Sequence, residues 1–109
     1  MLPKPVAISV STNYQDVLPF TLAENRGLFD HWYIVTAHDD LETQQILSSE
    51  PNVTTILFDF RQCYVVNGTQ WCPSFNKGGA LRRAQEQAHK ERPGCWYVIL
   101  DTDIVIRTQ

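Results

Sequence analysis

The chain has 109 residues, of which 43% are hydrophobic and 19% charged, and its formal net charge is −3. This length suits one domain, and the composition is that of a soluble globular protein. The weakly acidic balance, without a cluster of Lys and Arg, argues against a nucleic-acid partner. No apolar run reaches the roughly 18–20 residues of a transmembrane segment, and the N-terminus lacks the pattern of a secretion signal. We therefore expect a single cytoplasmic domain over 1–109 with reduced cysteines.

The first third of the chain predicts a strand, a helix and a second strand. Residues 6–12, VAISVST, alternate and are rich in β-branched side chains, which is typical of a buried strand. Asp16 is expected to cap the following helix, with Pro19 in its first turn and Gly27 at its stop. Residues 31–37, HWYIVTA, predict the second strand.

The alternation continues to the end of the chain. Asp39 or Asp40 is expected to cap a short helix, LETQQILSS, which stops before a proline. Residues 53–60 predict the third strand, and residues 74–91 predict the clearest helix, which ends at a Pro-Gly pair. The apolar run CWYVILDTDIVI, residues 95–106, predicts the fourth strand.

A tight hairpin is expected between the third strand and the last helix. Asn67 and Gly68 form the favoured pair for a two-residue turn, which sets Cys63 opposite Cys72 at a position where side chains lie close. A disulfide is geometrically possible there, but a reducing compartment favours two free thiols. No CxxC pair occurs, so a zinc site is not expected.

Two segments, 52–54 and 67–69, match the N-x-T pattern for glycosylation. The pattern is short and recurs by coincidence. Because no secretion signal precedes it, both matches are interpreted as coincidence.

This order of elements predicts an α/β fold of three layers, a Rossmann-like open sheet that is mostly parallel, with strand order 3-2-1-4 and a hairpin insertion at 63–72. In such sheets ligands bind beyond the carboxyl ends of the strands, where the strand order reverses. Here the reversal lies between the first and fourth strands, which brings residues 11–13 opposite Asp101 and Asp103. If both aspartates lie on a strand they share a face, and their like charges require a cation or a ligand's donors.

Four features now coincide: VSTNY at the end of the first strand, the acidic turn HDD after the second, FNKGGALRRA opening a helix, and DTD in the fourth strand. Together they resemble the nucleotide-binding half of GT-A-fold glycosyltransferases, in particular the family-2-like group. The resemblance implies that the chain binds a nucleoside-diphosphate sugar through Mn(II) or Mg(II), with a UDP-sugar as the first candidate. It also implies transfer of the sugar to an unknown acceptor.

The resemblance implies that the end of the first strand, Ser11, Thr12 and Asn13, contacts the nucleobase. In this family an aspartate after the second strand reads the base. Here Asp39 would take that role, with Asp40 as the second choice. Thr36 and Ala37 stand where the family usually has its paired acids, which leaves the identity of the base open.

The diphosphate side of the site is implied by the last two motifs. Asp103 would bind the metal directly, and Asp101 would contact the ribose or a metal-bound water, because hard divalent cations prefer oxygen ligands. Lys77 would place a point charge near the phosphates. The pair Gly78-Gly79 is interpreted as allowing the helix to pack closely on the sheet.

The catalytic base and the acceptor site of this family belong to the second half of its fold. A truncated or minimal chain of 109 residues is therefore expected to be inactive alone. A non-catalytic nucleotide- or partner-binding module is the alternative. A haloacid-dehalogenase-like phosphatase, with Asp101 as nucleophile and Asp103 as acid/base, is less favoured because that motif normally lies on a first strand.

The fourth strand would form an apolar edge of the sheet at WYVIL. An uncovered apolar edge pairs readily with another chain. We expect self-association through this strand.

Overall fold

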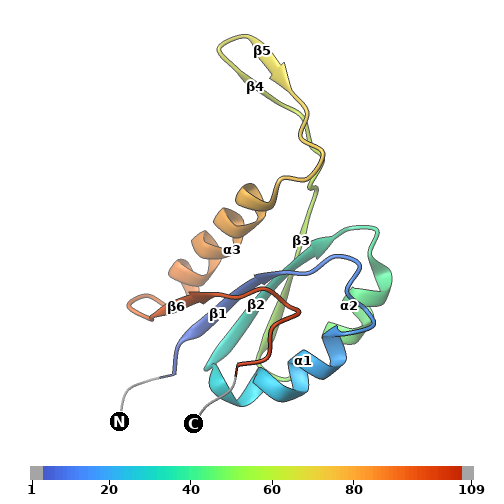
Figure 1. The fold of residues 1–109 in the computed structure, drawn as a ribbon. Coiled ribbons are helices and arrows are strands. Elements are labelled where there is room, and N and C mark those ends of the chain that lie inside the picture. The colour runs from blue at the N-terminus through green and yellow to red at the C-terminus, as the bar shows by residue number, and fades with distance from the viewer. Residues whose placement is uncertain (1–3, 107–109) are drawn as a thin grey trace.

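A computed structural model describes residues 4–106 and consists of a four-stranded sheet between two layers of helix (Figure 1). All neighbouring strands in this sheet are parallel, in the order β3-β2-β1-β6. This confirms the predicted α/β fold and the predicted order, because β6 is the fourth strand of the main sheet along the chain. The strands are β1 Val6–Val10, β2 His31–Ala37, β3 Val53–Phe58 and β6 Tyr97–Ile99.

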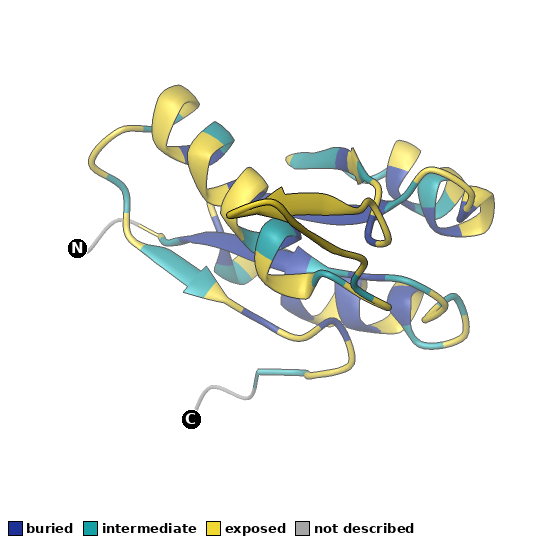
Figure 2. Ribbon diagram, turned by 90° about the horizontal axis from the view of Figure 1, so that it is seen from above, coloured by how far each residue is buried: buried dark blue, intermediate teal, exposed yellow. Residues whose placement is uncertain are grey.

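The helices cover both faces of the sheet, as Figures 1 and 2 show. On one face α1 (Leu18–Asn25), the 3₁₀ helix η1 (Arg26–Leu28) and α2 (Leu41–Ser48) pack, and on the other α3 (Lys77–Glu91). Side chains alternate along β1 and β2, so each strand contributes to both cores. Within residues 4–106, no helix has the length and apolar character needed to cross a membrane.

The core beneath α3 depends on three alanines. Ala80, Ala84 and Ala88 recur every four residues, so they line one face of the helix, and all three are fully buried. They contact a layer from the sheet that includes Tyr33 and Ile56. Small side chains let the helix approach the sheet closely while its polar face remains in solvent.

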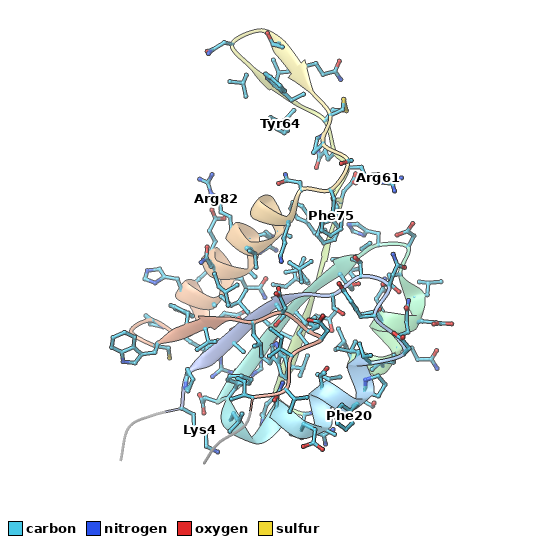
Figure 3. The ribbon with its side chains drawn as sticks, viewed as in Figure 1. Lys4, Phe20, Arg61, Tyr64, Phe75 and Arg82 are labelled. Carbon is cyan, nitrogen blue, oxygen red and sulfur yellow. A yellow bond between two sulfur atoms is a disulfide. The ribbon has the colours of Figure 1, made fainter. Side chains whose placement is uncertain are left out.

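The hairpin formed by β4 (Tyr64–Val66) and β5 (Thr69–Trp71) projects from the body (Figures 1 and 3). Its register and its turn are as predicted. The expectation of free thiols is wrong, because Cys63 and Cys72 are joined by a disulfide. The two Cα atoms lie only 4.2 Å apart across the hairpin, which brings the side chains within bonding reach.

Several predicted boundaries shift. The first and third strands end two residues earlier than expected, at Val10 and Phe58. Asp16 does not cap α1; Val17 is the N-cap residue, and no side chain caps it. The α-helix ends at Asn25 and passes into η1, so Gly27 lies inside a 3₁₀ turn.

The prediction of a fourth strand over 95–106 is wrong in its second half. The last hydrogen bond of the ladder runs from the Leu100 amide to the Ile8 carbonyl, 3.0 Å. The chain then turns, with the Ile104 amide donating to the Asp101 carbonyl at 3.2 Å. The buried Asn25 side chain holds the segment that follows, donating to the Ile104 carbonyl and accepting from the Ile106 amide. Asp101 and Asp103 therefore lie in a turn and not on one face of a strand.

Candidate functional site

Two open pockets lie side by side at the carboxyl ends of the strands. The first has a volume of about 810 Å³ and the second about 560 Å³. They share three lining residues, Thr12, Asn13 and Phe75. Both volumes fall within the range of small-ligand sites.

The second pocket lies where the strand order reverses, between β1 and β6. Thr12 and Asn13 follow β1, Asp101 and Asp103 follow β6, and Lys77 begins α3, and all five line this pocket. The predicted juxtaposition of the first-strand end with the two aspartates is present. The aspartates reach the pocket from a turn that leaves the sheet, and both are exposed.

Lys77 and Asp101 form an ion pair across this pocket. The ammonium nitrogen lies 3.1 Å from the Asp101 carboxylate, and the two side chains are 52% and 60% exposed. Exposed ion pairs contribute little to stability, so a ligand can replace either partner at low energetic cost. Among the residues that the structure describes, Asp103 makes no ion pair and no side-chain hydrogen bond.

Behind the pockets lie buried hydroxyl groups without hydrogen-bond partners. Thr102 lines the second pocket, is 2% exposed, and its hydroxyl has no partner within residues 4–106. Ser11 and Thr36 are fully buried and equally unpaired within that range, and they lie side by side because Val10 pairs with Val35. Buried hydroxyls are normally satisfied, and of these three only Thr102 lines a pocket in which a water or a ligand could supply the partner. Ser11 itself lines neither pocket.

The first pocket combines aromatic side chains with charge. Phe60 and Phe75 stack in parallel with ring centroids 4.5 Å apart, and Phe58 meets Phe60 edge-on at 5.2 Å. Asp39 also lines this pocket and is exposed. Arg61 also lines the pocket at the base of the hairpin, where Figure 3 shows it near Phe75.

The aromatic wall was missed by the reasoning from sequence. Its signal was the stretch FDFR, residues 58–61, which begins at the last residue of β3 and therefore emerges at the same end of the sheet as the other motifs. A second signal was Phe75, directly before the N-K-G-G stretch.

Asp40 has a structural role. It is the N-cap residue of α2 and is 8% exposed. Its two carboxylate oxygens accept hydrogen bonds from the amide and hydroxyl of Thr43, the amide of Asn13 and the side chain of Gln15. Burial alone would raise the pKa of Asp40, but these hydrogen bonds to the charged form outweigh it and the pKa is lowered. Asp40 thus ties the loop after β1 to α2 and positions Asn13 at both pockets.

The glycines at the start of α3 serve the helix cap. The Asn76 side chain caps α3 by accepting a hydrogen bond from the Gly79 amide at 2.8 Å. A Cβ on Gly79 would meet the Asn76 side chain at 2.5 Å, while a Cβ on Gly78 would meet nothing within 4 Å. The interpretation that this pair allows close packing of helix on sheet is therefore wrong.

Metal ligands are few at this site. Within residues 4–106, no group of three or more His, Cys, Asp or Glu side chains converges. Two aspartates without a third ligand suit a cation that keeps its waters and shares a substrate's phosphates, as Mg²⁺ does.

Comparison with known proteins adds no assignment to a family. No family model, curated protein or solved structure matches the chain. Because one fold supports many functions, the function has to be argued from the chemistry of the two pockets.

Proposed function

We propose that this chain is the nucleotide-binding half of a glycosyltransferase of GT-A fold and binds a nucleoside-diphosphate sugar, UDP-sugar first. The observation that carries this proposal is the second pocket. There the end of β1, the start of α3 and the DTD segment meet at the point where strand order reverses. That point is where open α/β sheets bind their ligands.

The two pockets divide the ligand between them. The first pocket receives the nucleobase, because it offers flat aromatic rings for stacking and Asp39 as a hydrogen-bond acceptor. The second pocket receives the diphosphate, because it holds Lys77 and both aspartates. Thr12 and Asn13 line both and would contact the nucleoside at the junction. Buried Ser11 supports this loop from behind.

A divalent cation, Mn(II) or Mg(II), fits the exposed carboxylates at the second pocket. Asp103 would hold it, and Asp101 would contact the ribose or a water on the cation. The bound cation would supply charge neutralisation for the diphosphate leaving group. Lys77 would exchange its ion pair with Asp101 for a phosphate oxygen, because its side chain is half exposed and free to move.

Sugar transfer requires more than a donor site. In glycosyltransferases of the proposed fold, the catalytic base and the acceptor site belong to the second half of the domain. The chain is therefore proposed to bind the donor and to transfer the sugar only as part of a longer protein.

A non-catalytic, metal-independent nucleotide-binding module is the second candidate. The Lys77–Asp101 pair favours it, because the lysine already neutralises one of the two carboxylates without a cation. Binding that is independent of metal would distinguish this module from the donor site of an enzyme.

The cellular compartment of the protein stays a prediction. The cytoplasmic location expected from the sequence conflicts with the Cys63–Cys72 disulfide, because cytosolic thiols are kept reduced.

Calorimetric titration with UDP, with and without Mn²⁺, tests the proposed donor site. We expect binding that depends on the metal. Replacing a group that supports a metal ligand from outside the first coordination shell typically weakens binding by roughly 10–100-fold. We expect Asp101→Asn to weaken UDP binding within that range. Asp103→Asn, which removes the proposed direct ligand, should weaken UDP binding by more.

Asp16→Asn is the matched control, because it removes an exposed carboxylate that lines neither pocket. UDP binding that Asp103→Asn leaves intact would place the diphosphate elsewhere. No binding of UDP, GDP or dTDP would refute the donor site altogether.

A further inference from the structure

The hairpin carries a feature that the donor site does not use. All residues from 61 to 72 are exposed, and the two strands have three residues each. An isolated two-stranded hairpin is at best marginally stable in water. The Cys63–Cys72 disulfide closes the base of this hairpin, so its conformation depends on a covalent link and not on a core.

The exposed disulfide indicates the cellular compartment in which the chain folds. Disulfides form and persist in oxidising compartments and are rare where glutathione and thioredoxin keep thiols reduced. Exposed disulfides are also among the more easily reduced ones. The disulfide-closed form of the hairpin is therefore the one expected in an oxidising compartment. N-linked glycosylation also takes place in such a compartment.

The tip of the same hairpin presents an N-x-T acceptor sequence. Asn67 and Gly68 form the turn with φ angles of +50° and +77°, and Thr69 begins β5. All three are exposed. In the part of the chain that the structure describes, neither the Asn67 amide nor the Thr69 hydroxyl makes a side-chain hydrogen bond, so both remain free for a modifying enzyme.

The other N-x-T sequence lies in a different setting. Asn52 precedes β3, and its carbonyl accepts a hydrogen bond from the Trp32 amide at 2.9 Å. The Thr54 hydroxyl lies 2.6 Å from His31 Nε2, within the sheet. This threonine is already engaged by the fold, which makes the site a matched comparison for the hairpin.

We propose that Asn67 carries an N-linked glycan, added in the oxidising compartment in which Cys63 and Cys72 pair. The Asn67 amide nitrogen forms a bond to C1 of the first sugar of a lipid-linked, diphosphate-activated oligosaccharide. The bond between C1 and the diphosphate oxygen breaks, the lipid diphosphate leaves with the electron pair, and the amide gives up one proton to a base of the transferase. This proposal is independent of nucleotide binding.

The experiment is to express the full-length protein in eukaryotic cells with its natural flanking sequence and treat it with peptide-N-glycosidase. We expect faster electrophoretic mobility after treatment and conversion of residue 67 from Asn to Asp, read by peptide mass spectrometry. Alkylation before denaturation should find Cys63 and Cys72 protected.

Four variants test the assignment. Asn67→Gln and Thr69→Ala should abolish the mobility change, whereas Thr69→Ser, which keeps a hydroxyl, and Asn52→Gln should retain it. Unmodified Asn67 in the purified protein would overturn the proposal, whether the two cysteines are paired or free. A mobility change that only Asn52→Gln removes would overturn the assignment to the hairpin.

Discussion

At the scale of single residues, Asp39 and Asp40 show how neighbouring identical side chains diverge. Asp40 is buried and accepts four hydrogen bonds, whereas Asp39 is exposed on the wall of the first pocket. The sequence left open which of the two caps the helix after the second strand, and the family resemblance implied that Asp39, in preference to Asp40, reads a nucleobase. The structure assigns the cap to Asp40, and the contact between Asp39 and a nucleobase stays a prediction.

Asp40→Asn should destabilise the protein by about 1–3 kcal/mol, because an amide group would then face donors that the carboxylate now accepts. The folded-state pKa of Asp40 is lowered, so its stabilisation is present above about pH 4 and is lost as the pH falls through the folded-state value. Urea unfolding of both proteins between pH 7 and pH 3 should show their difference shrinking at acid pH.

Asp39→Asn is the control for that measurement. Removing this exposed carboxyl should change stability by no more than about 0.5 kcal/mol. Its effect should fall on UDP affinity instead. Equal destabilisation by the two variants would contradict the assignment of the cap to Asp40.

At the scale of elements, the start of α3 contains two glycines with different requirements. Gly79 leaves room for the capping side chain of Asn76, and Gly78 faces open space. The sequence shows a Gly-Gly pair, but it predicted neither the cap by Asn76 nor which glycine that cap needs. The answer depends on where the Asn76 side chain lies.

We therefore expect opposite effects from the same substitution at adjacent positions. Gly78→Ala should stabilise the protein by roughly 0.4–1 kcal/mol, because alanine lowers the entropy of the unfolded chain without a clash. Gly79→Ala should destabilise it by about 1 kcal/mol through displacement of the cap. Thermal unfolding monitored by circular dichroism measures both, and a loss of stability in Gly78→Ala would show an unseen contact there.

At the scale of the whole molecule, β3 and β6 form the two edges of the sheet, and within residues 4–106 no further strand pairs with either. β6 bonds to β1 through alternate residues, so the amide of Ile99 points away from the sheet, and its side chain is 53% exposed. The strand is only three residues long, which limits its capacity to pair. Self-association through β6 stays a prediction.

The variant Ile99→Lys tests self-association through β6, because a lysine on an edge strand opposes pairing with a second chain. Sedimentation velocity over a concentration series should show the unsubstituted chain self-associating and Ile99→Lys shifted to the monomer. Leu57→Lys, on the opposite edge at β3, is the control and should leave association unchanged. A stable monomer of the unsubstituted chain at high concentration would refute the prediction.

The sequence alone determined the alternation of strands and helices, the strand order and the meeting of the motifs at one edge of the sheet. Those features follow from hydrophobic periodicity and from the rules for parallel sheets, which act locally or through topology. It also determined the register of the hairpin, because the Asn-Gly turn leaves few alternatives.

Only the tertiary structure decided how the fourth strand ends and what the cysteines do. The run from 95 to 106 is apolar enough for a long strand, but Asn25 on α1 binds the backbone at Ile104 and Ile106 and draws the chain off the sheet. The disulfide depends on the approach of Cys63 and Cys72 in space, which spacing permitted without requiring. Long-range partners decided both, and a local pattern in the sequence does not contain them.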